Sequence, residues 1–320
     1  MADVEAAATR ISGKARRTAT LNFSSLDATS KAQVYVKLES FQRTGSFKFR
    51  GALNRVLQLT PAEREAGIVT FSSGNHGAAV ALAASMVGAS ATVVIPADAS
   101  KVKIAAIESY GGELHFYDRS TEEPATVAKS IVERTGGVLV PPFDDYDVIA
   151  GQGTLALELF EDVGDLDVVV APIGGGGLIA GVGTVVKARG RRLVGVEPAG
   201  AADTYLSVAN GKRQQAGTAN SIADGLLTPI PGELTFPINQ TNIDEIVLVS
   251  EDDILQAMQF CFERMKLVVE PSGAVGLAAI LSGAVGAEAG QIGVVVTGGN
   301  VSLSRLFELI GERSLRPHST

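Results

Sequence analysis

Residues 168–187 read VVVAPIGGGGLIAGVGTVVK, and this stretch predicts the fold more directly than any other part of the chain. Val168 to Val186 carries no charge and is long enough to cross a bilayer. Pro172 and four consecutive glycines interrupt it, however, and Asp167 and Lys187 flank it closely. A buried strand, a glycine loop and a buried helix fit this pattern better, so no membrane span is predicted.

The same alternation of strands and helices extends in both directions from this stretch. It is typical of an α/β protein with mostly parallel sheets. Strands are predicted at 33–38, 68–71, 91–95, 114–117, 138–140, 168–171, 193–196, 246–249 and 292–296. Helices are predicted at 77–87, 102–110, 124–135, 151–162, 178–187, 251–265, 273–281 and 303–310.

The order of the predicted strands indicates two lobes. The segment 67–142 contains four of them and reads as a small domain inserted into a larger one. The large domain is expected to comprise 1–66 and 143–320. Each lobe is expected to be an open, mostly parallel sheet flanked by helices.

Composition excludes several classes of protein. The 320 residues are 46% hydrophobic and 19% charged, with a net charge of −8, which opposes a nucleic-acid surface. The N-terminus contains acidic residues and no apolar region behind them, which argues against a signal peptide. The only cysteine, Cys261, lies in an apolar stretch and is interpreted as a small core residue. We therefore expect a cytoplasmic protein with no nucleic-acid or membrane partner.

A lysine in an apolar setting is the first chemical signal. Lys48 lies between Phe47 and Phe49, close after a predicted strand. Such surroundings disfavour an ammonium and lower a lysine's pKa, as Schiff-base chemistry requires. A solvated surface lysine is the alternative, and the local residues alone do not decide between the two.

A second signal is the turn SSGNHG at 72–77, which joins a predicted strand to an alanine-rich helix. Free backbone N–H groups and the helix dipole favour an anion at such a turn, and a substrate carboxylate suits it. An ordinary helix cap is the alternative. Two serines, an asparagine and a histidine exceed what a cap needs.

The glycine loop itself has two interpretations. Consecutive glycines let backbone amides surround a phosphate. Gly175, Gly177 and Ala180 also match the dinucleotide pattern G-x-G-x-x-A, with Glu197 at the end of the next predicted strand. The loop alone does not separate a nicotinamide cofactor from a monophosphate.

Taken together, the motifs resemble the serine/threonine dehydratase and serine racemase family of fold type II pyridoxal-phosphate enzymes, whose fold is like that of the tryptophan synthase β subunit. The resemblance extends from about residue 37 to residue 300. The dinucleotide interpretation leaves the other motifs unexplained. Those motifs are SFKFRGA at 46–52, SSGNHG at 72–77, PPFDD at 141–145, VIAGQGT at 148–154, GGGG at 174–177, IADG at 222–225, VEPSG at 269–273 and TGGN at 297–300.

The resemblance implies a set of cofactor contacts. Lys48 would bind pyridoxal 5′-phosphate as a Schiff base and remove the substrate's α-proton, with Phe47 packed nearby. Asn75 would hydrogen-bond to the phenolic oxygen, and Thr297 would face the pyridine nitrogen, where the family often has serine. The phosphate would be held by Gly174, Gly175, Gly176 and Gly177.

The resemblance also implies how substrate and metal are bound. Ser72, Gly74, Asn75 and His76 would bind the substrate carboxylate, and Ser73 would be catalytic on the face opposite Lys48. Glu197, Ala201 and Asp203 match the family's divalent-cation site. Their hard oxygen ligands suit Mg²⁺, Ca²⁺ or Mn²⁺. A solvated acidic loop is the alternative for these three residues.

The activity implied is elimination of water from a β-hydroxy amino acid, with L-threonine and L-serine favoured and a 2-oxo acid and ammonia released. Alternatives are a serine racemase, a dehydratase of 3-hydroxyaspartate or phenylserine, and a cofactor-binding protein without catalysis. A homodimer is expected.

Overall fold

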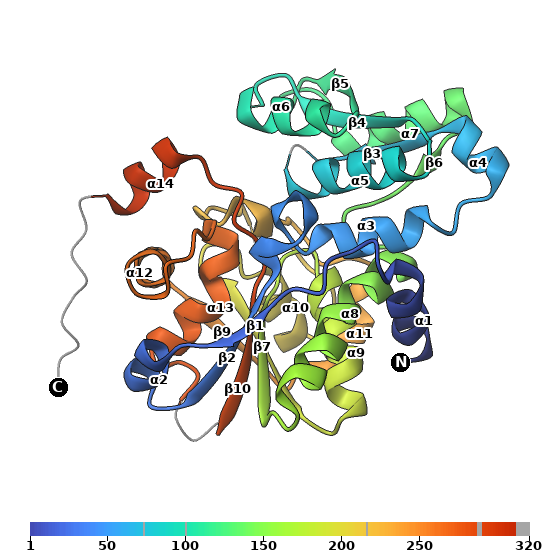
Figure 1. The fold of residues 1–320 in the computed structure, drawn as a ribbon. Coiled ribbons are helices and arrows are strands. Elements are labelled where there is room, and N and C mark those ends of the chain that lie inside the picture. Colours follow the sequence, from blue (N-terminus) through green and yellow to red (C-terminus); the bar gives the residue numbers. More distant parts are fainter. Residues whose placement is uncertain (73, 100, 216, 287–289, 312–320) are drawn as a thin grey trace.

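The computed structural model contains two β-sheets (Figure 1) and describes residues 1–72, 74–99, 101–215, 217–286 and 290–311. The larger sheet has the order β1-β2-β10-β7-β8-β9 and the smaller one β5-β4-β3-β6. The strands are β1 Thr20–Asn22, β2 Gln33–Leu38, β3 Ile68–Phe71, β4 Ala91–Pro96, β5 Glu113–Tyr117, β6 Val138–Leu139, β7 Val168–Pro172, β8 Arg192–Pro198, β9 Glu245–Val249 and β10 Gln291–Val296.

The larger sheet is covered by helices on both faces. All its neighbouring strands run parallel except β1, which is antiparallel to β2. Val168 and Val170 of β7 pack with α2 (Ser24–Ser30), α12 (Glu251–Phe260) and α13 (Pro271–Leu281). Val169 and Ala171 pack on the other face with α1 (Ala2–Ile11), α8 (Tyr146–Val163) and α9 (Gly177–Ala188). Burial on both faces explains why these strands read as unbroken apolar runs.

The smaller sheet is entirely parallel and has the same layered design. Val93 and Ile95 of β4 pack against α5 (Asn75–Met86) and α6 (Lys101–Ser109). Val94 packs on the opposite face with α7 (Pro124–Thr135). The structure thus confirms the α/β class and the mostly parallel sheets.

Every predicted strand is present, and each predicted helix is found at its expected place. One helix differs in kind: the predicted 251–265 segment is α-helical only to Phe260 and continues as a π-helical segment, Cys261–Met265. Cys261 is fully buried there, as predicted, and burial raises the pKa of its thiol to about 12. The elements that the sequence did not predict are α1, α2, β1, α3 (Lys48–Val56), α4 (Pro61–Ala66), α10 (Asp203–Ala209), α11 (Thr235–Asn242) and the 3-10 turns Glu39–Phe41, Arg43–Gly45 and Asp224–Leu226.

The membrane-like stretch divides into β7, the glycine loop and α9, as predicted. Among the described residues, no helix combines the length and apolarity that crossing a bilayer requires.

Helix α3 is fixed by close packing and by buried charge. Gly51 of α3 and Gly151 of α8 approach so closely that a Cβ on Gly151 would lie 2.6 Å from the Gly51 Cα. Arg50, fully buried, donates to Glu39 at 2.8 Å and to Glu158 of α8 at 2.7 Å. Lys48 begins this helix, so its backbone is held by the packing of α3 on α8.

Candidate active site

A cavity of about 720 Å³ lies between the two sheets, and segments that follow β3, β7 and β10 line it. The carboxyl ends of parallel strands commonly form binding sites in open α/β sheets. The sequence predicts a number of the lining residues as site residues, and Ser73, also predicted, lies outside the described residues. Those present in the lining are Phe47, Lys48, Ser72, Gly74, Asn75, His76, Gly174, Gly175, Gly176, Gly177 and Thr297.

Lys48 presents its amine to this cavity. Its Nζ donates to the Pro142 carbonyl at 2.6 Å and lies 5.2 Å from the centroid of the Phe47 ring. The side chain borders the cavity and is therefore only partly buried. The surrounding protein nevertheless removes enough water to lower the pKa of the amine to about 8. About a tenth of the amine is then uncharged at pH 7, far more than for an ordinary lysine, and the uncharged form is the one that acts as a nucleophile or base.

The glycine loop faces the same cavity at the start of α9. The N–H groups of Gly174 to Gly177 have no hydrogen-bond partner among the described residues. Gly176 has φ +90°, and a Cβ there would lie 2.4 Å from Asn239 Nδ2. The loop therefore requires glycine at 176 and presents unpaired donors next to a helix N-terminus, which suits an anion.

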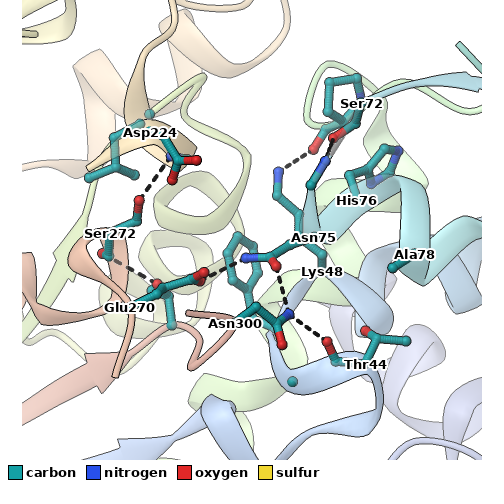
Figure 2. Close-up of a pocket in the computed structure, with 18 of the residues that line it drawn as sticks. Thr44, Lys48, Ser72, Asn75, His76, Ala78, Asp224, Glu270, Ser272 and Asn300 are labelled. Carbon is teal, nitrogen blue, oxygen red and sulfur yellow. Dashed lines mark hydrogen bonds between the residues drawn. The ribbon is translucent and has the colours of Figure 1, made fainter. Parts of the chain in front are cut away.

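Asn75 joins α5, which packs on the smaller sheet, to segments of the chain that flank α13 and β10 of the larger sheet (Figure 2). It is the first residue of α5, and its Nδ2 donates to Glu270 Oε1 at 2.7 Å. Asn300 Nδ2 donates to Asn75 Oδ1 at 2.7 Å and to the Thr44 carbonyl at 2.7 Å. These contacts fix the orientation of the Asn75 amide. Burial raises the pKa of Glu270 to about 8.

His76 is buried beside the cavity. Its Nε2 lies 3.0 Å from the Val140 carbonyl, which can only accept, so Nε2 is the donor. Burial and, secondarily, the charge of Lys48 lower the pKa of His76 to about 3. The neutral ring then leaves Nδ1 as an acceptor, and Nδ1 has no partner in the described part of the chain. His76 therefore presents no positive charge to a carboxylate.

Thr297 directly follows β10 and lines the cavity together with Lys48. It is 3% exposed, and its Oγ1 is 3.4 Å from the Ser272 carbonyl. Ser272 Oγ in turn accepts from the Gly225 N–H at 2.9 Å. Thr297 thus offers a hydroxyl, without charge, to a ligand in the cavity.

The predicted metal ligands lie outside the cavity, where β8 ends and α10 begins. Glu197 and Asp203 are buried, and Glu197 accepts from the Thr204 and Tyr205 N–H groups at 3.0 and 2.7 Å. Neither Asp203 carboxylate oxygen has a partner among the described residues. Burial raises the pKa of Asp203 to about 7, and burial together with the Asp203 charge raises that of Glu197 to about 8.

Sequence reasoning missed several residues that shape the cavity. Glu270, Asn300 and Asp224 line it but had no assigned role, although each lies within a motif already quoted. Their roles depend on contacts between segments far apart in the chain, such as Asn75 with Glu270. Spacing alone does not reveal such contacts.

The chain as a whole is similar to known proteins. Residues 11–298 match the family model described as pyridoxal-phosphate dependent enzyme. The L-threo-3-hydroxyaspartate ammonia-lyase of a Pseudomonas species is 42% identical over 310 residues, covering 96% of this chain and 97% of that protein.

Solved structures agree with this match. Maize serine racemase superposes with a TM-score of 0.92 at 40% identity, covering 96% of this chain and 95% of that one. The T.th. threonine deaminase superposes with a TM-score of 0.88 at 40% identity, covering 95% and 99%. The same fold therefore occurs in enzymes that are named for different reactions.

Proposed function

The chain belongs to the pyridoxal-phosphate-dependent enzyme family, in its fold type II branch, and from that premise we propose that it eliminates water from a β-hydroxy amino acid. The products would be a 2-oxo acid and ammonia. One observation carries the proposal: a lysine amine of lowered pKa and a loop of unpaired amides face the same cavity. A cofactor-binding protein without catalysis would need the same lowered pKa to form the Schiff base, so release of ammonia in a turnover assay separates the two functions.

The residues fit the cofactor. The four glycine amides suit a phosphate, Lys48 suits an aldehyde carbon, and Thr297 suits a ring nitrogen. When bound, pyridoxal phosphate would withdraw electrons from the amino acid's Cα, so that the α-proton is lost more readily and the electron pair left at Cα can expel the β-hydroxyl. We assign the phosphate to Gly174–Gly177 and the covalent attachment to Lys48, with Phe47 packed beside it.

Lys48 would have two tasks. Its amine holds the cofactor, and once released by substrate it takes the proton from the substrate Cα. The lowered pKa supports the second task, since a base near neutral pH must be partly deprotonated. The Pro142 carbonyl, 2.6 Å from Nζ, offers the released amine a fixed hydrogen-bond acceptor.

Substrate binding is assigned to the turn before α5. The carboxylate would accept from the Ser72 hydroxyl, whose Oγ accepts from the Gly74 N–H at 3.2 Å, and from other backbone N–H groups of the turn, with the helix dipole favouring negative charge. Asn75 Nδ2 has a second hydrogen besides the one donated to Glu270, and we assign it to the cofactor's phenolic oxygen. His76 would shape the pocket as a neutral group. We keep Ser73 as a catalytic residue by resemblance.

Thr297 supports elimination over other reactions at Cα. A hydroxyl does not hold a ring nitrogen protonated as a carboxylate does, so the ring stores less negative charge. Prompt loss of a β-leaving group is favoured under that condition. Its methyl group distinguishes Thr297 from the serine that is common in the family.

We also propose a structural divalent cation at Glu197, Asp203 and the Ala201 carbonyl. Two buried carboxylates with raised pKa values, one lacking any described partner, are poorly stabilised without a positive charge. Oxygen ligands of this kind suit Mg²⁺, Ca²⁺ or Mn²⁺.

Two substrate classes remain in competition. L-Threonine and L-serine lead, because a small uncharged side chain needs no counter-ion. A β-hydroxy amino acid with a second carboxylate is the other candidate, because Lys103 and Arg119 line the cavity and a 42% identical relative is named for 3-hydroxyaspartate. The likeness to serine racemases also places racemisation among the outcomes to measure.

Assays with a panel of β-hydroxy amino acids test the proposal. Purified protein loaded with pyridoxal phosphate should release ammonia and a 2-oxo acid in equal amounts from one of them. Lys48→Ala should abolish this release, while Lys101→Ala, an exposed lysine outside the cavity, should retain it. Absence of both products with L-threonine, L-serine, 3-hydroxyaspartate and phenylserine would reject the proposed function.

Further assignments extend the proposal. The two separate sheets support a large domain of 1–66 and 143–320 and a small domain of 67–142. A single buried thiol and a net charge of −8 support a cytoplasmic location. A homodimer is proposed from the resemblance, and light scattering on purified protein measures it.

A further inference from the structure

Two carbonyls of the glycine loop accept hydrogen bonds from side chains of helix α11. Thr235 Oγ1 donates to the Gly175 carbonyl at 2.7 Å, and Asn239 Nδ2 donates to the Gly176 carbonyl at 3.2 Å. Both side chains are fully buried, and neither lines the cavity. Helices α11 and α9 pack against each other (Figure 1), so these contacts belong to their interface.

Peptide planarity converts these contacts into the direction of the amide groups. In a trans peptide the C=O and the following N–H point in opposite directions. Because the Gly175 carbonyl points toward Thr235 of α11, the Gly176 N–H points away from that helix. The Gly176 carbonyl accepts from the Ala180 N–H within α9 at 2.9 Å as well as from Asn239, so both helices fix the direction of the Gly177 N–H. The loop borders the cavity, and these N–H groups have no partner in the described residues.

The start of α11 is itself anchored. The Asp144 carboxylate accepts from the Glu233 N–H at 2.9 Å and from the Leu234 N–H at 2.8 Å. Acceptance of N–H groups at a helix start stabilises that end of the helix. Asp144 follows Phe143, which lines the cavity. Asp144 thus connects the start of α11 to the wall of the cavity at Phe143.

We propose that Thr235 and Asn239 are positioning residues that direct the Gly176 and Gly177 amides at the ligand's phosphate. The inference rests on the proposed cofactor, yet it concerns residues that do not touch it. Without the Thr235 hydroxyl, the Gly175 carbonyl loses its shorter hydrogen bond and keeps only the contact from the Gly232 N–H at 3.4 Å, so the plane of the Gly175–Gly176 peptide is held less firmly. The phosphate would then meet a loop whose donors are less ordered.

Affinity for pyridoxal phosphate and for pyridoxal, which lacks the phosphate, tests this inference. Thr235→Val has nearly the same shape as threonine and removes the donor. It should weaken binding of pyridoxal phosphate by about tenfold, as expected for one lost hydrogen bond. Binding of pyridoxal should change less than about twofold, as judged from the absorbance of the Lys48 adduct. Thr235→Ser restores a hydroxyl and should restore affinity.

A matched control lies on the same helix. Thr241 Oγ1 donates to the Pro237 carbonyl within α11 at 2.9 Å and is exposed. Thr241→Val should leave both affinities unchanged. The ³¹P resonance of the bound cofactor should shift in Thr235→Val and return in Thr235→Ser. Asn239→Leu should act in the same direction with a smaller effect, because the Ala180 N–H still donates to the Gly176 carbonyl at 2.9 Å.

The outcomes separate the two proposals. If the wild-type protein binds no pyridoxal phosphate, the proposed function fails. If the wild type binds it and Thr235→Val binds it equally well with an unchanged ³¹P resonance, the positioning role is wrong. Equal weakening of pyridoxal and pyridoxal phosphate would also overturn that role, since it would show general damage to the cavity.

Discussion

In protein kept free of divalent cations by a chelator, the buried carboxylates of Glu197 and Asp203 should make the free energy of unfolding depend on pH. Burial and the charge of Asp203 raise the pKa of Glu197 from 4.5 to about 8. A carboxyl whose pKa is raised by folding binds more protons in the folded than in the unfolded state between those values. The contribution of this carboxyl to the free energy of unfolding is therefore fully present below pH 4.5 and is lost as the pH rises toward 8.

The size of the effect follows from the shift. Each pH unit inside this window costs about 1.4 kcal/mol of unfolding free energy for one carboxyl. Between about pH 5 and pH 7, Glu197 alone should thus remove about 3 kcal/mol from a protein kept free of divalent cations. Asp203, whose pKa is raised to about 7, acts in the same direction. A bound cation should offset this loss, because it takes the place of the proton.

Urea unfolding at about pH 5, 6 and 7 in chelator measures the effect, with Glu197→Gln as the matched variant. The amide that this substitution introduces cannot ionise, so the wild type should lose about 3 kcal/mol more than the variant across this range. The variant has its own pH-independent cost, since an amide N–H faces the Tyr205 N–H. The slope with pH is therefore the test.

Mg²⁺ or Ca²⁺ should then flatten the wild-type slope and leave the variant unchanged. Parallel pH profiles of the two proteins in chelator would refute the buried charge. A cation effect of equal size in both proteins would refute the metal site at these residues.

Two further substitutions test the loop and the support of α3. Gly176→Ala places a methyl 2.4 Å from Asn239 Nδ2 at a residue with positive φ. The affinity for pyridoxal phosphate should therefore fall at least about tenfold in absorbance titrations. Unchanged affinity would contradict the requirement for glycine at this position. Arg50→Ala leaves the fully buried Glu39 without its cation and should cost about 3 to 5 kcal/mol in urea unfolding. Arg17→Ala, which breaks two surface ion pairs, with Glu161 and Asp162, should cost less than about 1 kcal/mol. Equal losses in Arg50→Ala and Arg17→Ala would contradict the importance of the buried pair.

Much of the fold could be predicted because the strands are buried on both faces. Runs such as 168–171 and 292–296 are apolar throughout, and the loop of four glycines marks the strand-to-helix turn. Helix α3 was missed because Lys48, Arg50, Asn54 and Arg55 make it look polar. Arg50 is nevertheless fully buried, paired with two carboxylates that lie elsewhere in the chain.

Sequence motifs likewise predicted only part of the candidate site. Lys48 and the glycines of the loop carry their chemistry in local sequence, so motifs identify them. Thr235 and Asn239 do not, because their importance comes from two hydrogen bonds to the loop across sixty or more residues. Buried polar side chains that bond to distant carbonyls look like any threonine or asparagine in the sequence.

Attachment of the cofactor to Lys48 is the central claim, and one measurement tests it most directly. Purified protein loaded with pyridoxal phosphate should be reduced with borohydride, digested and mapped by mass spectrometry. We expect one phosphopyridoxyl group, on Lys48, and none in Lys48→Ala. A label on another lysine, or an unlabelled wild-type protein, would contradict this attachment.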